Sequence, residues 1–147
     1  MDDSSFSVAR ADDRALITAV IHRYCHMARE NADFAAMAPL FTHDGVFRIP
    51  GRDLAPTEID QVVRGEGPRF IRHHATTIDI RFVAADEART ETFFLAVTDE
   101  ANPDHWGCWR DVFRKQSDGR WLIQERTVVP EGAAPSGWLV RVYSKPR

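Results

Sequence analysis

Two adjacent histidines are the residues of this sequence best suited to proton transfer. His73 and His74 open a stretch in which Ile78, Ile80 and Phe82 alternate with polar residues. Strict alternation of this length predicts a half-buried strand. Neighbouring strand residues point to opposite faces, so one imidazole should face the interior and the other should face solvent. An imidazole titrates near pH 6.5, and the inward one is therefore a candidate general acid or base.

The alternation alone does not decide which histidine faces inward. Uninterrupted pairing places His74 on the same face as Ile78. A bulge of one residue between them would reverse this and turn His73 inward. Both histidines remain candidate catalytic residues at this point.

Tyr24 is the third candidate, because it lies near the middle of an apolar helical face. A helix is predicted over residues 13–31, in which apolar positions recur at steps of three and four. His22 and His26 fall on the opposite, polar side of that helix. They have the i, i+4 spacing of metal ligands but lack a glutamate between them and a third ligand, so no metal site is expected.

Asp111 and Arg126 fall on adjacent predicted strands, and two interpretations are open. They could form a cross-strand ion pair. Alternatively, Arg126 could face a cavity and hold a substrate oxygen, while Asp111 orients the catalytic histidine.

The elements that must position these residues form an α+β pattern, with helices first and an antiparallel meander after them. A strongly curved sheet over the first helix would enclose a cavity, which we expect Phe41, Phe47, Phe94 and Trp109 to line. Shorter helices are predicted at 33–41 and 56–65, and strands at 46–49, 74–84, 88–99, 105–116 and 120–130. The apolar piece at 138–143 should be a sixth strand or an arm onto a neighbouring subunit.

Length and composition set wider bounds. The 147 residues fit a flexible tail (1–11) and one domain (12–147). A net charge of −3 argues against a nucleic-acid partner, and the chain has no apolar run long enough to span a membrane. The start of the chain does not resemble a signal peptide, and there are only two cysteines. We expect a cytoplasmic protein without cofactor or metal.

The sequence resembles the SnoaL-like branch of the nuclear-transport-factor-two-like superfamily over residues 12–130. The resemblance rests on four segments: LITAVIHRYCHMA (16–28), DFAAMAPLFTHDGVF (33–47), RHHATTIDI (72–80) and WRDVFRKQSDGRWLIQER (109–126). It implies a cone-shaped α+β barrel, a small-molecule ligand and a homo-oligomer, either a dimer or a trimer. It also implies a working tyrosine at Tyr24 and a histidine at His73, which favours His73 over His74.

Two features depart from the dehydratase-like members of that branch. These usually carry an acid about five residues after the tyrosine, whereas this chain has Arg29 there and Glu30 next to it. The segment FFLAVT (93–98) also offers no inward acid or histidine.

Three functions are therefore weighed. The first is a lyase or isomerase, dehydratase- or cyclase-like, that acts by acid–base proton transfer on a hydrophobic, cyclic or aromatic, oxygenated molecule. The second is a non-catalytic pocket protein. The third is an assembly module resembling the small subunit of ring-hydroxylating dioxygenases, which an exposed apolar surface at 138–143 would favour.

Overall fold

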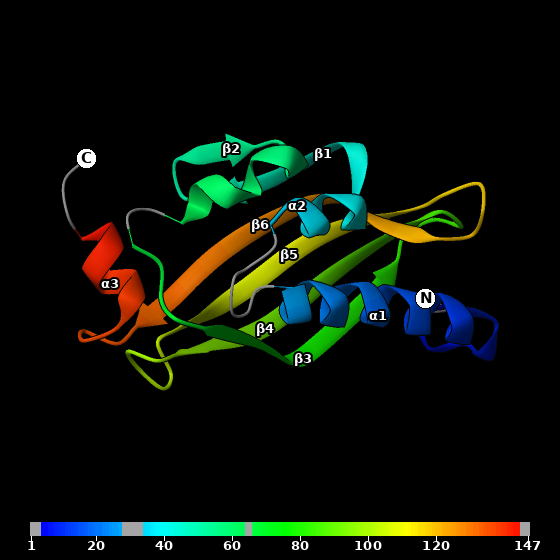
Figure 1. The fold of residues 1–147 in the computed structure, drawn as a ribbon. Coiled ribbons are helices and arrows are strands. Elements are labelled where there is room, and N and C mark those ends of the chain that lie inside the picture. Colours follow the sequence, from blue (N-terminus) through cyan, green and yellow to red (C-terminus); the bar gives the residue numbers. More distant parts are fainter. Residues whose placement is uncertain (1–3, 28–33, 64–65, 145–147) are drawn as a thin grey trace.

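A computed structural model of the chain describes residues 4–27, 34–63 and 66–144. Its long first helix, α1 (Ala11–Met27), lies across a curved six-stranded sheet (Figure 1). The strands are β1 (Phe41–Ile49), β2 (Arg52–Leu54), β3 (Ile71–Phe82), β4 (Glu87–Thr98), β5 (His105–Lys115) and β6 (Trp121–Ala133). The short helices are α2 (Phe34–Met37), α3 (Trp138–Tyr143) and the 3₁₀ turns η1 (Ser4–Phe6), η2 (Val8–Arg10), η3 (Ala38–Leu40) and η4 (Pro56–Val62).

The α+β class and the long helix on a curved sheet are as the sequence predicts. The strand order is β2-β1-β6-β5-β4-β3, and the sheet is open, since β2 and β3 form its two edges. Every pair is antiparallel except β1 with β6, which is parallel. The expected all-antiparallel sheet is therefore corrected to a mixed one, because β1 comes from the helical half of the chain and not from the meander.

The core fills the space between α1 and the concave face of the sheet. Ile17 and Ile21 of α1 are fully buried, as are Phe113 and Ile123 of the sheet. A polar contact fixes the start of the helix: the Asp13 carboxylate accepts hydrogen bonds from Lys115 Nζ (2.9 Å) and Trp121 Nε1 (2.8 Å). This anchor sets the height at which Tyr24, three turns later, meets the sheet.

The segment 4–10, which we expected to be part of a flexible tail, forms η1 and η2 against the sheet. Ser5 is buried, and its Oγ accepts a hydrogen bond from the Phe82 amide (3.0 Å). The Arg10 guanidinium donates to the carbonyls of Ala84 and Ala85. The end of α1 predicted at Asn31, the residues Arg29 and Glu30, and the predicted helix cap at Asp33 lie outside the described residues.

Three local predictions are wrong. Residues 138–143 form the helix α3 rather than a strand or an extended arm, because the distant Asp104 carboxylate accepts the amide hydrogens of its first turn. The strand predicted at 46–49 begins already at Phe41 and contains a register shift, and β2 was not predicted. The helix at 56–65 is a 3₁₀ helix that ends at Val62. No helix in the described ranges is long and apolar enough to cross a membrane.

Candidate functional site

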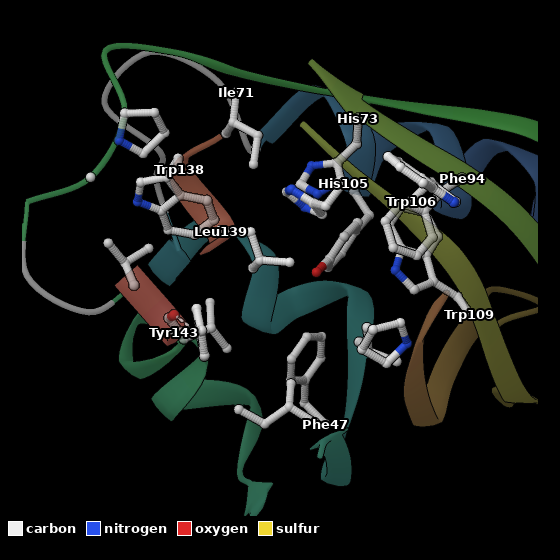
Figure 2. Close-up of a pocket in the computed structure, with 18 of the residues that line it drawn as sticks. Phe47, Ile71, His73, Phe94, His105, Trp106, Trp109, Trp138, Leu139 and Tyr143 are labelled. Carbon is white, nitrogen blue, oxygen red and sulfur yellow. Dashed lines mark hydrogen bonds between the residues drawn. The ribbon is translucent and has the colours of Figure 1, made fainter. Parts of the chain in front are cut away.

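A cavity of about 820 Å³ lies between the concave face of the sheet, α1, η4 and α3 (Figure 2). This volume is within the range of small-molecule sites. Its walls are mainly apolar and include seven aromatic side chains: Tyr24, Phe47, Phe94, Trp106, Trp109, Trp138 and Tyr143. The wall also includes two imidazoles, His73 and His105, and the guanidinium of Arg69.

His73 faces this cavity and His74 is exposed to solvent. The cause is a bulge in β3. Ala75 pairs with Phe94 and Thr77 with Phe93, so Thr76 has no partner of its own in the ladder. The Thr76 hydroxyl donates instead to the Phe93 carbonyl (3.0 Å). The extra residue reverses the alternation that Ile78, Ile80 and Phe82 establish, and turns His73 inward.

The neighbours of His73 are mainly aromatic rings. Its ring centroid lies 6.4 Å from that of Tyr24, 5.7 Å from Trp109 and 5.9 Å from His105. Its Nδ1 atom has no hydrogen-bond partner among the residues that the structure describes. Burial lowers the pKa of His73 to about 3, and the positive charge of Arg126 acts in the same direction. At neutral pH this imidazole is therefore uncharged.

Tyr24 reaches the cavity from α1, as its central place on the apolar face predicts. Its ring makes an edge contact with Trp109, with centroids 5.2 Å apart. Burial raises the pKa of Tyr24 to about 12, although the Arg126 guanidinium opposes the rise. The phenol is therefore protonated at neutral pH and can donate a hydrogen bond to an oxygen in the cavity.

Arg126 and Asp111 face each other across β5 and β6 and form a two-armed ion pair. Nε lies 2.8 Å from Oδ1 and Nη2 lies 2.7 Å from Oδ2, and both side chains are completely shielded from solvent. The Arg126 Cζ atom lies between two rings, 4.2 Å from the centroid of Tyr24 and 4.3 Å from that of Trp109. Burial alone would lower the pKa of Arg126, but the Asp111 charge raises it above its ordinary value.

This geometry corresponds to the ion-pair interpretation. Arg126 lies behind Tyr24 and Trp109 and not in the cavity wall, so its expected direct grip on a substrate oxygen is not seen. Asp111 accepts from Arg126 and from the Thr90 hydroxyl rather than from a histidine. The expected orienting role of Asp111 is therefore wrong, because the guanidinium directly opposite occupies both carboxylate oxygens.

The carboxylate that does orient a cavity histidine is Asp104, which the sequence analysis missed together with His105. His105 Nδ1 lies 2.8 Å from Asp104 Oδ1. Burial would raise the pKa of Asp104, but hydrogen bonds from His105, Thr98 and two backbone amides hold it below its usual range. An ionised carboxylate can only accept, so Nδ1 carries the hydrogen and Nε2 keeps its lone pair. One signal was available: His105 has the same strand parity as Trp109, Asp111 and Phe113.

Aromatic rings form much of the cavity wall. Phe94 and Trp109 are stacked with centroids 4.5 Å apart and planes 12° apart. Phe47 lines the cavity, as expected, but Phe41 does not; it packs against Phe47 in the core, with centroids 6.3 Å apart. Phe41 is instead buried in the core, with 3% of its surface exposed. Such walls suit a planar, apolar molecule with few polar groups.

Comparisons with known proteins agree with this description. Residues 9–127 match the model of the SnoaL-like domain family. No curated protein matches the sequence. Three solved structures illustrate the fold. A protein provisionally assigned as a scytalone dehydratase from Novosphingobium aromaticivorans is 20% identical, with a TM-score of 0.67 over 84% of this chain and 87% of that one.

The second structure is the hexachlorocyclohexane dehydrochlorinase LinA-type3 from Novosphingobium barchaimii, which is 15% identical. Its TM-score is 0.71 over 85% of this chain and 90% of that one. The third is a Catenulispora acidiphila protein in complex with S-DNPA, 28% identical, with a TM-score of 0.64 over 82% of this chain and 94% of that one. The first two, below 25% identity, establish the shared fold.

Proposed function

The chain belongs to the SnoaL-like domain family, and on this premise we propose that it is a lyase or isomerase that moves a proton on an apolar, planar, oxygenated molecule. The observation that supports this most directly is the convergence of Tyr24, His73 and His105 on one apolar cavity. Two similar folds carry names that describe eliminations, a dehydratase and a dehydrochlorinase. Elimination is thus a chemistry that this fold accommodates.

His105 is the proposed general base. A base works best when its pKa is near the working pH, and the strongly lowered pKa of His73 makes it a poor one. The ionised Asp104 accepts the hydrogen of His105 Nδ1, which leaves Nε2 free to accept a proton. The role moves from His73, which resemblance favoured, to a histidine that has a carboxylate partner.

In the proposed reaction, His105 Nε2 removes a proton from the carbon next to a carbonyl. The Tyr24 phenol donates a hydrogen bond to the carbonyl oxygen, on which negative charge develops. The electron pair of the broken C–H bond then forms a C=C bond, and the C–O bond on the neighbouring carbon breaks. The departing hydroxyl takes the proton from His105 and leaves as water. Neutral His73 assists as a hydrogen-bonding group and as part of the wall.

The remaining candidate residues have supporting parts in this proposal. Phe47, Phe94 and Trp109 hold the flat substrate, and the Arg126–Asp111 pair holds Tyr24 and Trp109 from behind. His74 has no part, because it is exposed on the other side of β3. The reaction as written uses no cofactor.

The test is an elimination assay with cyclic β-hydroxyketones that carry a fused aromatic ring, followed by the ultraviolet absorbance of the enone product. We expect turnover that falls on the order of 10²–10³-fold in Tyr24→Phe, the typical loss of one oxyanion donor. A matched control is Tyr143→Phe, which removes the other phenol of the cavity, whose hydroxyl donates to the Val62 carbonyl and not to a substrate. Equal turnover in wild type and Tyr24→Phe would contradict the proposed mechanism.

A non-catalytic pocket protein is the second candidate function, and one observation favours it. Burial keeps both His73 and Tyr24 uncharged near neutral pH, which suits retention of a neutral ligand as well as turnover. Tight binding of aromatic ketones, with no turnover of any β-hydroxyketone, would favour this alternative. The third candidate, an assembly module, loses support because residues 138–143 pack onto the cavity, with Trp138 buried.

We also propose a cytoplasmic homo-oligomer, a dimer or a trimer, with a small molecule as its partner. Both cysteines, Cys25 and Cys108, are free, which suits a reducing compartment. Phe93 is exposed, next to Phe94, which lines the cavity, and aromatic residues of this kind concentrate at interfaces. Light scattering at micromolar concentration should give a multiple of 16.7 kDa, and a monomer mass would refute the assembly.

A further inference from the structure

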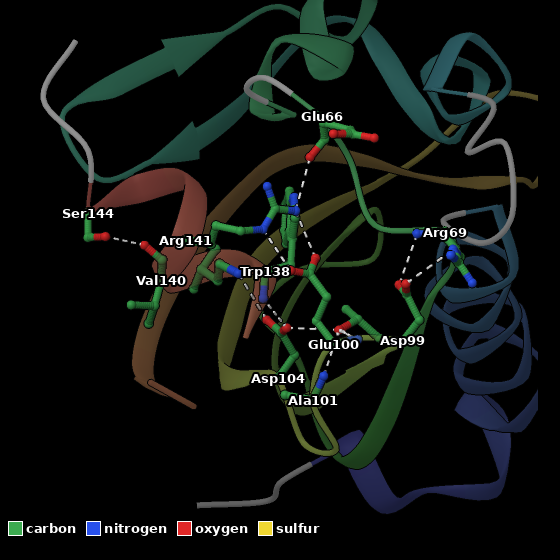
Figure 3. Close-up of polar contacts among 12 residues, drawn as sticks. Glu66, Arg69, Asp99, Glu100, Ala101, Asp104, Trp138, Val140, Arg141 and Ser144 are labelled. Atoms are coloured by element: carbon green, nitrogen blue, oxygen red, sulfur yellow. Dashed lines mark hydrogen bonds and ion pairs between the residues drawn. The ribbon is translucent and has the colours of Figure 1, made fainter. Parts of the chain in front are cut away.

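The Asp104 carboxylate serves two parts of the molecule at once (Figure 3). Oδ1 receives hydrogen bonds from His105 Nδ1 (2.8 Å) and from the Leu139 amide (3.2 Å). Oδ2 receives them from the Trp138 amide (2.6 Å) and the Thr98 hydroxyl (2.9 Å). Asp104 is completely buried while α3 is docked, so in this state protein groups supply its hydrogen bonds. Each oxygen thus joins the strand side of the cavity to the first turn of α3.

Helix α3 is a wall of the cavity. Trp138, Leu139 and Tyr143 line the space, and the helix lies at the end of the sheet farthest from the start of α1 (Figures 1 and 2). The Trp138 ring lies 6.0 Å from that of His105, measured between centroids. Movement of α3 would therefore open the cavity directly beside His105.

Other polar anchors of α3 are the part-buried Tyr143 hydroxyl, which donates to the Val62 carbonyl, and an ion pair at the surface. Arg141 pairs with both carboxylate oxygens of Glu100, at 2.6 and 2.8 Å, and its side chain is 40% exposed. Exposed pairs of this kind contribute little to stability. The buried anchor at Asp104 is the stronger one, because hydrogen bonds to a shielded charge are worth more than those in water.

Asp104 and the residue before α3 lie so close together that a side chain on that residue has no room. A Cβ atom on Gly137, the residue before α3, would lie 2.6 Å from Asp104 Oδ2. The contact between the carboxylate and the helix therefore requires glycine at this position. A tight contact of this kind has two states, docked or broken, and little between them.

We infer that Asp104 is a positioning residue that couples the docking of α3 over the cavity to the tautomer of His105. With α3 docked, both carboxylate oxygens are fixed, Nδ1 carries the hydrogen, and Nε2 presents its lone pair to the cavity. With α3 released, the carboxylate loses two fixed donors and gains water, and the imidazole is free to turn or to take the other tautomer. The base is thus prepared only in the closed cavity.

The catalytic meaning of this coupling rests on the proposed function, but the coupling itself can be measured without a substrate. Nitrogen-15 NMR of the histidine ring distinguishes the two tautomers, and amide hydrogen exchange at Leu139 reports α3 docking. In the wild type we expect hydrogen on Nδ1 of His105 and a protected Leu139 amide. Failure of the elimination assay with these signals intact would sink the proposed function and leave the coupling standing.

Asp104→Asn is the direct variant. Asparagine has one acceptor oxygen, so it cannot serve both the imidazole and the amides of α3. We expect the hydrogen of His105 to move to Nε2 and the Leu139 amide to exchange about ten- to a hundredfold faster, the factor that corresponds to loss of a hydrogen bond to a charged group. An unchanged tautomer with unchanged exchange would overturn the inference.

Arg141→Ala tests the coupling without touching the carboxylate, and it serves also if Asp104→Asn does not fold. Loss of the Glu100 pair should loosen α3, speed exchange at Leu139 a few-fold and bring a matching fraction of the Nε2–H tautomer. Arg110→Ala is the matched control, since Arg110 lies on the same strand as His105 and pairs with exposed Glu91; it should change neither signal. Faster exchange in Arg141→Ala with His105 wholly in the Nδ1–H form would also overturn the inference.

Discussion

Two buried carboxylates, Asp104 just before β5 and Asp111 within it, have different kinds of partner. Both oxygens of Asp111 accept hydrogen bonds from Arg126, a permanent cation directly opposite on β6. Asp104 shares its oxygens among an imidazole, a hydroxyl and two amides of α3. Both are almost completely shielded, with exposed fractions of 3% for Asp111 and 0% for Asp104.

The difference shows that the partner, more than the burial, decides what a buried carboxylate does. A guanidinium never releases its proton under ordinary conditions, so the Asp111–Arg126 pair cannot take part in proton transfer and acts as a support. An imidazole can gain and lose a proton, so Asp104 can act on chemistry through His105. The sequence left two interpretations of Asp111 open, and the observed contacts correspond to the ion pair with Arg126 and not to the orientation of a histidine.

The largest expected effect is on stability, at the supporting pair. Asp111→Asn leaves the Arg126 charge buried without a counter-charge, and we expect it to lower the free energy of unfolding by about 3–5 kcal/mol. Urea denaturation measures this. Glu91→Gln, at an exposed pair with Arg110, is the control and should cost less than about 1 kcal/mol. A loss below about 1 kcal/mol in Asp111→Asn would remove the contrast between the two carboxylates.

The second effect is on turnover, at the imidazole pair. His105→Gln removes the base but keeps a hydrogen-bonding group of similar size, so turnover should fall on the order of 10²–10⁴-fold. Near-ultraviolet circular dichroism should show that the aromatic cavity keeps its packing. If His105→Gln keeps full turnover and His73→Gln does not, the base is His73. The claim that Asp104 acts on the chemistry through His105 would then be wrong.

The third effect is on the pH dependence of stability and concerns His73. Its pKa is lowered from 6.5 to about 3 in the folded protein, so the unfolded chain binds the proton first as the pH falls. Stability from this group is full above pH 6.5 and declines by about 1.4 kcal/mol per pH unit below it, until the pH nears the folded value. Urea denaturation at pH 7, 6, 5 and 4 should show a shallower decline for His73→Gln than for wild type. Parallel declines would contradict the assignment of His73 as a buried neutral imidazole.

The smallest effect belongs to His74, whose side chain is exposed. His74→Gln should leave turnover within about twofold of wild type and stability within about 0.5 kcal/mol, the usual range for surface positions. A large loss of turnover in this variant, measured beside His73→Gln, would mean that β3 pairs without the bulge at Thr76.

The sequence predicts those features that depend on local patterns. The apolar face of the first helix gives α1 and the inward direction of Tyr24, and alternation gives four of the strands to within a few residues. The inward direction of His73 needed the bulge at Thr76, which alternation cannot reveal because it assumes regular pairing. The family resemblance favoured His73 as the inward histidine, which the structure confirms, whereas the alternation pattern alone did not decide between His73 and His74.

The features that the sequence did not reveal depend on contacts between distant segments. Asp104 is 34 residues from the α3 amide that it accepts, and no local pattern connects the two. A short apolar segment such as 138–143 suits a strand as well as a helix, and the contact with Asp104 that favours the helix cannot be read from the segment itself. The structure places Tyr24 and His73 at a cavity, as predicted, while the Asp104–His105 pair was missed, and the catalytic roles stay predictions.

The central claim, that this cavity removes protons through His105, can be measured directly without the natural substrate. 2-Tetralone, a planar aromatic ketone, is incubated with the protein in D₂O, and loss of its α-hydrogen signals is followed by proton NMR. We predict exchange well above the buffer rate in wild type and His74→Gln, and exchange near the buffer rate in His105→Gln. Binding of the ketone with no exchange above buffer, or undiminished exchange in His105→Gln, would contradict the account.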